Sequence, residues 1–174
     1  MSKLILLILS LLYFTLSLVL CKPFDKRDSK GIHVEGNKLL DGNGNEFVFR
    51  GVNVPHEWFI EKTESSIRDI ADLGANSVRI VLSGGTYRAK TPIEELEQII
   101  AWCEETGLVA VLELHDFTGK DDPNMILSTA VNYWTDIKDF LNAHKDYIIV
   151  NIANEWIGSM ETGKPLGRYL CHCY

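Results

Sequence analysis

The fold is decided by Tyr147-Ile148-Ile149-Val150-Asn151-Ile152-Ala153-Asn154-Glu155-Trp156, an apolar run that stops abruptly at Asn, Glu and Trp. A near-continuous apolar run of this kind is typical of a strand buried in a parallel sheet. Three comparable runs precede it, and helical patterns separate the four. The predicted strands are 46–54, 76–82, 108–114 and 147–153, and the predicted helices are 65–73, 91–106 and 128–143. This alternation predicts an α/β fold with a parallel sheet buried on both faces.

Local signals define the ends of the predicted helices. Gly74 and Gly107 follow the first two helices and are good C-terminal stops. Thr91 is the predicted N-cap of the second helix, with Pro92 at its first position. The pair Asp121-Asp122 indicates a solvated loop or a helix cap. The third helix is expected to bury one apolar stripe, formed by Ala130, Trp134, Ile137, Phe140 and Leu141.

The first 21 residues indicate a secretory signal peptide, because Lys3 precedes a Leu-rich apolar run and a polar exit follows it. A transmembrane anchor is the alternative, since about 17 apolar residues is the lower limit for crossing a bilayer. We therefore expect a secreted, extracellular protein. The expected parts are a signal peptide (1–21), a linker (22–31), a folded domain (32–158) that opens with a β-hairpin (32–35 with 38–41), and an atypical tail (159–174).

Charge and cysteine content exclude several classes of partner. Removing Lys3 with the signal leaves 16 basic and 24 acidic residues, so the net charge becomes 16 − 24 = −8. An acidic surface argues against nucleic acid or an anionic membrane as partner and is compatible with a neutral substrate. The sequence Cys171-His172-Cys173 offers too few ligands for a metal site without a second cluster. We expect neither a metal nor an organic cofactor.

Polar and aromatic side chains gather where the predicted strands end. In parallel α/β folds a ligand lies off the carboxyl ends of the strands. The residues found there are Asn53, His56 and Trp58 after the first strand, Arg79 on the second, Glu113 and His115 on the third, and Asn154, Glu155 and Trp156 after the fourth. A Glu at such a position can donate a proton, an Asn can hold a hydroxyl, and a Trp face can stack on a sugar ring. The pattern therefore predicts a polar pocket suited to a carbohydrate.

Some of these residues also have a purely structural interpretation. Arg79 could pair with Glu113 inside the fold, which would not exclude a role in orienting the acid. His115 could be a hydrogen-bonded core histidine, and Trp58 could be a core residue. Glu155 is the hardest to explain structurally, because a carboxylate at the end of a buried strand is costly unless it is paired or used.

Four segments together resemble glycoside hydrolase family 5, a family of retaining (β/α)8 glycosidases, and within it the bacterial-type endo-β-1,4-mannanases. The segments are 50–53, 74–83, 115–122 and 149–156, and the resemblance covers roughly residues 32–158. It implies that Glu155 is the general acid/base, that Asn154 binds the 2-hydroxyl, and that Arg79 and His115 line the site. We also expect His56, Trp58 and Trp156 to contact the polysaccharide substrate.

The resemblance implies the N-terminal half of a (β/α)8 barrel, about four βα units preceded by a hairpin. A complete barrel usually needs about 250 residues, and the family's second carboxylate, its nucleophile, belongs to a later strand that this sequence lacks. Four strands leave two open edges. We therefore expect these 174 residues to self-associate or be unstable, and to be inactive. Mannan is the favoured substrate and cellulose the next. The alternative is a non-catalytic carbohydrate-binding remnant of such an enzyme.

Overall fold

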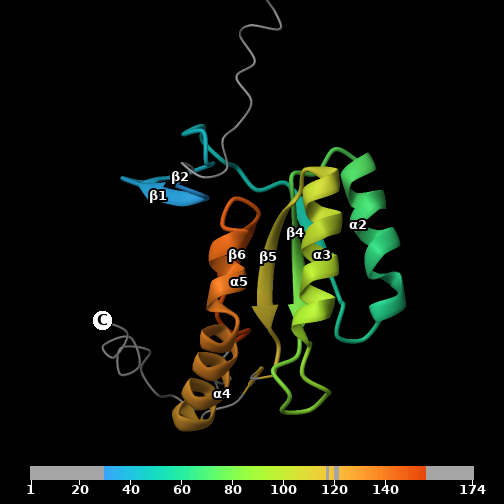
Figure 1. The fold of residues 1–174 in the computed structure, drawn as a ribbon, viewed down its shortest axis with the longest axis vertical. Coiled ribbons are helices and arrows are strands. Elements are labelled where there is room, and N and C mark those ends of the chain that lie inside the picture. Colours follow the sequence, from blue (N-terminus) through green and yellow to red (C-terminus); the bar gives the residue numbers. More distant parts are fainter. Residues whose placement is uncertain (1–29, 117, 120–121, 156–174) are drawn as a thin grey trace, which may run out of the picture.

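The computed structural model describes residues 30–116, 118–119 and 122–155 (Figure 1). Strands and helices alternate after an N-terminal hairpin. The strands are β1 (His33–Glu35), β2 (Lys38–Leu40), β3 (Gly51–Val54), β4 (Ser77–Leu82), β5 (Val109–Leu114) and β6 (Ile148–Asn151). The helices are the 3-10 turn η1 (Ile60–Lys62), α2 (Thr63–Asp72), α3 (Ile93–Thr106), α4 (Pro123–Asp136) and α5 (Lys138–Ala143).

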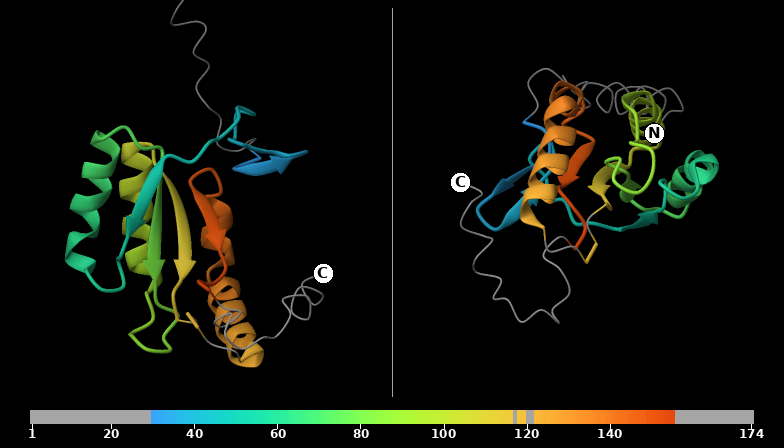
Figure 2. Two further views of the ribbon diagram at one scale, coloured as in Figure 1. Left: turned by 180° about the vertical axis from the view of Figure 1, so that it is seen from behind. Right: turned by 90° about the horizontal axis from the view of Figure 1, so that it is seen from below.

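The strands β3, β4, β5 and β6 form one parallel sheet in chain order, which confirms the predicted α/β architecture (Figures 1 and 2). Across the sheet, Arg79 of β4 lies beside Asn53 of β3 and Val111 of β5. β3 approaches β4 so closely at Gly51 that a Cβ atom there would lie 1.9 Å from the carbonyl oxygen of Ser77. The absence of a side chain at Gly51 is therefore what permits this strand pair.

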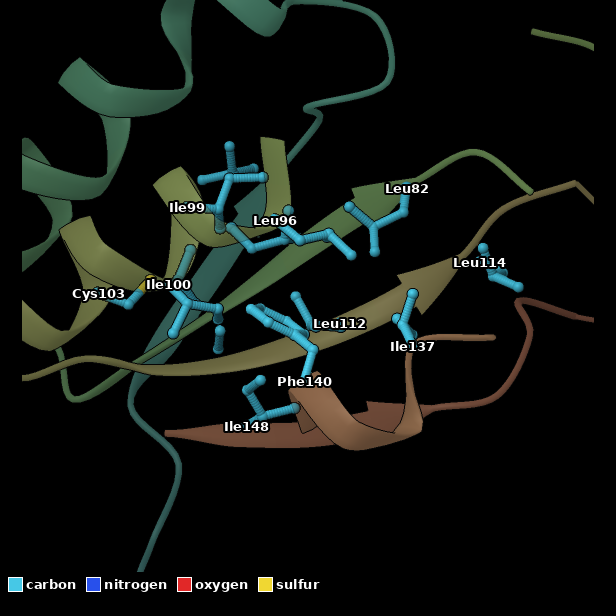
Figure 3. Close-up of a cluster of buried hydrophobic side chains, with 14 of the residues drawn as sticks. Leu82, Leu96, Ile99, Ile100, Cys103, Leu112, Leu114, Ile137, Phe140 and Ile148 are labelled. Carbon is cyan, nitrogen blue, oxygen red and sulfur yellow. The ribbon is translucent and has the colours of Figure 1, made fainter. Parts of the chain in front are cut away.

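The helices pack on one face of the sheet and form the core with it (Figure 3). Alternate strand residues point to that face, as the period of two in a strand requires. The core contains Val78, Ile80, Leu82, Ala110, Leu112 and Leu114 from the strands and Leu96, Ile99, Ile100, Tyr133, Ile137 and Phe140 from the helices. Burying one such Leu or Ile side chain contributes roughly 1.5–3 kcal/mol. The opposite face of the same strands is left for Arg79, Glu113 and Asn151.

Burial on both faces, as predicted from the apolar runs, holds for the two central strands and is wrong for the outer two. In β4 and β5, Val81 is 4% exposed and Glu113 is 0% exposed. In the outer strands, Val52 of β3 is 59% exposed and Val150 of β6 is 37% exposed. The physical reason is that β3 and β6 each have one strand neighbour among the described residues. The sheet therefore presents two open edges.

Thr91 does not cap α3 in the predicted manner. Pro92 occupies the N-cap position, and no side chain accepts a hydrogen bond from the first turn. The Thr91 hydroxyl instead accepts from the backbone N–H of Ser83, at 3.0 Å, and so ties the start of α3 to the end of β4. The predicted stop at Gly107 is confirmed, because this residue adopts the left-handed conformation with φ of 73°.

The third predicted helix starts earlier than residue 128 and is interrupted. Asp122 caps α4, since its Oδ1 accepts from the N–H groups of Asn124 and Met125 at 3.0 and 3.2 Å. The helix therefore begins at Pro123, and the predicted cap is confirmed for Asp122, while Asp121 lies outside the described residues. The chain leaves helical geometry at Ile137, between α4 and α5. The predicted apolar stripe nevertheless faces the core throughout.

The predicted hairpin is confirmed as β1 and β2, which pair with each other and not with the parallel sheet. Figure 1 shows it beside the amino ends of the sheet strands, away from their carboxyl ends. The predicted first strand is shorter than expected, because residues 46–50 add one isolated bridge, between Leu40 and Glu46. The predicted signal peptide, most of the linker, Trp156 and the tail lie outside the described residues. Within the described part of the chain, no helix has both the length and the apolar character to cross a bilayer.

Candidate active site

Arg79 joins the carboxyl ends of the sheet strands into one network. Its Nε and Nη2 atoms donate to Oδ1 of Asn151 at 3.3 and 3.1 Å. Nη2 also donates to Oδ1 of Asn154 at 2.9 Å. The planar guanidinium group offers several donors in a fixed arrangement, which a lysine ammonium group does not. One side chain in the middle of β4 thereby holds both Asn151, the last residue of β6, and Asn154, which follows that strand.

Glu113 of β5 lies beneath this network and is fully buried. Its Oε2 is 3.3 Å from Nη2 of Arg79 and 3.3 Å from Nδ1 of His115. Burial raises the pKa of Glu113, and the positive charge of Arg79 and the contact with His115 oppose that rise. The structural pairing of Arg79 with Glu113 is confirmed. It coexists with the contacts that Arg79 makes to Asn151 and Asn154.

The segment Asn154-Glu155 is held in place by its backbone and by the Asn154 side chain. The N–H of Asn154 donates to the carbonyl oxygen of Leu114 at 2.8 Å, and its Nδ2 donates to Oγ1 of Thr118 at 2.8 Å. The Glu155 carbonyl oxygen accepts from the N–H of Gly119 at 3.3 Å. These contacts fasten the end of β6 to the end of β5.

Glu155 has an unusual backbone conformation. Its φ is +44°, and among the described residues it is the one non-glycine residue in the left-handed region. This conformation costs an L-residue about 1–2 kcal/mol. Such strain gathers at functional sites, where the surrounding structure enforces it. The turn leaves the Glu155 residue exposed to solvent at the edge of the network.

Trp58 and His115 lie against each other at the same end of the sheet. Their ring centroids are 5.0 Å apart and the ring planes meet at 82°, an edge-to-face contact. The guanidinium carbon of Arg88 lies 5.7 Å from the centroid of the Trp58 ring, in cation–π geometry. Trp58 is 38% exposed, so it is not a core residue. Part of its surface is available to a ligand.

Two acidic residues near His115, Glu57 and Asp116, were given no role by the sequence analysis. The Glu57 side chain is 7% exposed and pairs with Nε of Arg88 at 3.4 Å. Burial raises the pKa of Glu57, and the nearby carboxylate of Asp116 adds to the rise. Asp116 accepts from the backbone N–H groups of Gly84 and Thr86 and so holds the loop after β4. Their position directly after predicted strand ends is the signal that could have revealed them.

His56 lies apart from this network. Its Nδ1 is 2.8 Å from Oγ1 of Thr63, its Nε2 is 3.0 Å from Oε2 of Glu95, and the residue is 2% exposed. Both ring nitrogens are thus engaged, and the ring links the start of α2 to α3. A buried ring with both nitrogens bonded has no polar atom to offer a sugar. We therefore assign His56 to the scaffold and not to the predicted substrate contacts.

Comparison with known proteins identifies the family of this chain. Residues 40–168 match the model of the cellulase family, glycosyl hydrolase family 5. This match extends over more than half of the sequence.

The chain belongs to glycosyl hydrolase family 5.

Relatives of this family 5 chain include two proteins named mannan endo-1,4-beta-mannosidase. The one from Cellvibrio japonicus is 45% identical over 132 residues, which is 75% of this chain and 31% of the relative. The one from Salipaludibacillus agaradhaerens is 44% identical over 131 residues, which is 75% of this chain and 42% of the relative. The beta-mannanase crystal structure from Streptomyces thermolilacinus superimposes with a TM-score of 0.70 at 42% identity, covering 76% of this chain and 45% of that one. The chain thus spans less than half the length of these relatives.

In this family 5 chain, the fold brings together most of the predicted site residues. Arg79 contacts Asn154, the residue before Glu155, and it contacts Glu113, which in turn contacts His115. The ring of Trp58 lies against that of His115. Trp156 lies outside the described residues. Within the described residues, no group of three or more His, Cys, Asp or Glu side chains is placed to hold a metal ion. Among the described residues, this end of the sheet carries the exposed residue Glu155, the hydrogen-bonding side chains of Arg79 and Asn154, and the partly exposed Trp58.

Proposed function

We propose that this chain carries the acid/base half of a retaining glycosidase that cleaves β-1,4-linked mannan. The observation that carries the proposal is the strained Asn154-Glu155 turn, which is anchored to the sheet through Arg79. The names of the relatives support mannan as the substrate class, with cellulose next. In this proposal Glu155 protonates the leaving glycosidic oxygen and later takes a proton from the incoming water.

The neighbouring side chains would bind the sugar. Because a side-chain amide nitrogen carries two hydrogens, Nδ2 of Asn154 can donate both to Thr118 and to a sugar hydroxyl. Arg79 and His115 would provide charge and hydrogen bonds beside the reacting carbon. The exposed part of Trp58 would stack on a sugar ring, and Trp156 would add a second aromatic surface.

A retaining glycosidase also needs a nucleophilic carboxylate about 5 Å from the acid. Neither of the two buried glutamates near the site suits this role. Glu113 is enclosed and contacts Arg79 and His115, while Glu57 is paired with Arg88. We therefore propose that the nucleophile is absent from the described residues and that these 174 residues alone do not turn over substrate.

The proposal is tested by measuring mannohexaose and cellohexaose binding by calorimetry and mannan hydrolysis with the 174-residue chain. We expect mannohexaose to bind more tightly, and we expect no hydrolysis above that of the Glu155→Gln variant. Robust hydrolysis that Glu155→Gln abolishes would show that the chain holds a complete catalytic pair. Tighter binding of cellohexaose would replace mannan by cellulose as the substrate class. A non-catalytic carbohydrate-binding role remains the alternative, favoured if binding persists when a second half-barrel is supplied and turnover does not appear.

Two further properties belong to the proposal. We propose that residues 1–21 direct secretion, which a reporter fused to this segment would test by appearing in the culture medium. We also propose that the open edges of β3 and β6 lead to self-association. The exposed apolar side chains beside these edges, Val52 and Val150, support this.

A further inference from the structure

We propose that Glu113 is a positioning residue, which fixes the tautomer of His115 and couples that ring to Arg79. This inference deepens the proposed function and rests on it for the purpose that the ring would serve. Glu113 and Arg79 lie on the same face of neighbouring strands, because β4 and β5 pair Val81 with Glu113 and Arg79 with Val111. The Glu113 carboxyl group is therefore placed at the centre of the network and is closed off from solvent.

One oxygen of Glu113 faces two nitrogens at once. Nη2 of Arg79 and Nδ1 of His115 both lie 3.3 Å from Oε2. The positive charge of Arg79 at this distance favours the ionised form of Glu113, and an ionised carboxylate can only accept hydrogen bonds. The contact between Oε2 and Nδ1 of His115 is therefore one in which the ring nitrogen donates. Nδ1 of His115 must then carry a hydrogen.

The consequence for His115 concerns its second nitrogen. In a neutral imidazole ring one nitrogen donates and the other accepts. With the hydrogen on Nδ1, Nε2 becomes the acceptor and can receive a hydrogen bond from a hydroxyl group. The edge-to-face contact with Trp58 holds the ring from a second side. Glu113 thus determines which kind of group His115 can bind.

The same oxygen also connects His115 to the acid. Arg79 Nη2 contacts Glu113 Oε2 and donates to Oδ1 of Asn154, the residue before Glu155. A buried charge without partners would be strongly destabilising, whereas an apolar residue of similar volume at this place is often tolerated. Packing alone therefore does not require a carboxylate at position 113, whereas the arrangement of Arg79 and His115 does.

The test is the ring-nitrogen NMR spectrum of the 15N-labelled 174-residue chain, recorded in solution or in the sedimented solid if the chain associates. The sequence has five histidines, and the signal of His115 is identified by its loss in His115→Gln. We expect the neutral ring of His115 to carry its hydrogen on Nδ1. A hydrogen on Nε2 in the unmodified chain would overturn the proposal without any variant at Glu113.

Variants extend the test. Glu113→Met removes the acceptor, so we expect His115 to lose its Nδ1–H form, whereas Glu113→Gln keeps a carbonyl oxygen and should preserve it. The matched control is Glu104→Met, because Nδ1 of His144 lies 2.9 Å from Oε1 of Glu104. That control should alter His144 and leave His115 unchanged. Retention of the Nδ1–H form in Glu113→Met, or its loss in Glu113→Gln, would contradict the proposal. The measurement needs no turnover, so its failure is distinguishable from a failure of the proposed glycosidase.

Discussion

At the scale of single residues, the site depends on one arginine that serves three acceptors. Arg79 contacts Asn151, Asn154 and Glu113 through Nε and Nη2. A lysine at this position would keep the charge but could not meet all three acceptors from one fixed plane. The position of Asn154, and with it the turn at Glu155, is therefore expected to loosen when Arg79 is replaced.

We expect Arg79→Lys to lower the free energy of unfolding by roughly 1–3 kcal/mol, the range for losing hydrogen bonds to a charged group. Denaturant unfolding of the two chains measures this change. Mannohexaose binding should weaken in the same variant. Unchanged stability together with unchanged binding would show that Arg79 is not the central donor of the site.

Glu57 makes stability depend on pH. Its pKa in the folded protein is raised above the ordinary 4.5 by burial and by Asp116. The folded state therefore holds this proton at pH values where the unfolded state has lost it. It follows that the stability contributed by Glu57 is present below about pH 4.5 and is lost as the pH rises through the folded-state value.

We expect Glu57→Gln to remove this dependence. In denaturant unfolding at a series of pH values upward from 4.5, the parent chain should lose stability relative to the variant. The variant Glu61→Gln, at an exposed position of η1, is the control and should follow the parent. A difference between Glu57→Gln and the parent that does not change with pH would contradict the assignment.

Sequence reasoning identified Arg79, His115, Asn154 and Glu155 because the ends of parallel strands meet at one edge of a sheet. It could not assign the partners of His56, because the contacts to Thr63 and Glu95 depend on how α2 and α3 pack. It also gave no role to Glu57, for which the position after the first predicted strand was the available signal. Contacts between side chains on different elements can be assigned only from the three-dimensional structure.

At the scale of elements, the sequence predicted the N-cap of α4 correctly and that of α3 incorrectly. Asp122 accepts hydrogen bonds from the first turn of α4, as is common for an aspartate at this position. The Thr91 hydroxyl accepts from the N–H of Ser83 and does not cap α3. Both residues precede a proline, so the sequence alone does not distinguish them. The difference arises because the end of β4 lies beside Thr91 and offers a competing donor.

Replacing the cap of α4 tests this interpretation. We expect Asp122→Ala to reduce the free energy of unfolding by about 1 kcal/mol, the typical contribution of an N-cap side chain. Asp122→Ser keeps an oxygen that can accept from the N–H groups of Asn124 and Met125 and should restore most of the loss. Equal stabilities of the alanine and serine variants in thermal or denaturant unfolding would show that Asp122 does not act as a cap.

At the scale of the whole molecule, helices cover one face of the sheet, and β3 and β6 form open edges within the described part of the chain. The alternation of strands and helices was enough to predict the parallel sheet and its order. The exposure of Val52 and Val150 could be anticipated from a four-stranded sheet, but not from the apolar runs themselves. An apolar run predicts a buried strand, but its side chains are buried only where another strand or a helix packs against them.

We expect the 174-residue chain to associate through these edges in a concentration-dependent manner, measured by light scattering on a sizing column. A charge on an edge strand opposes pairing, so Val52→Lys should shift the chain toward the monomer. Val34→Lys is the matched control, because Val34 is 72% exposed but lies on the β1 hairpin, away from the edge of β3. A monomeric parent chain, or an equal effect of both variants, would contradict association through β3.

The most direct test joins residues 30–155 to the part of the Streptomyces thermolilacinus beta-mannanase that the match does not cover, and measures mannan hydrolysis. We predict an active chimera that loses about 10²–10⁴-fold in rate on mannan when Glu155 is replaced by Ala, the range for removing a general acid. On an activated aryl mannoside, whose leaving group needs no proton, the loss in kcat/KM should be much smaller, because this ratio reports the first step, in which the leaving group departs. An active chimera in which Glu155→Ala hydrolyses mannan as fast as the parent would contradict the assignment of Glu155 as the acid/base.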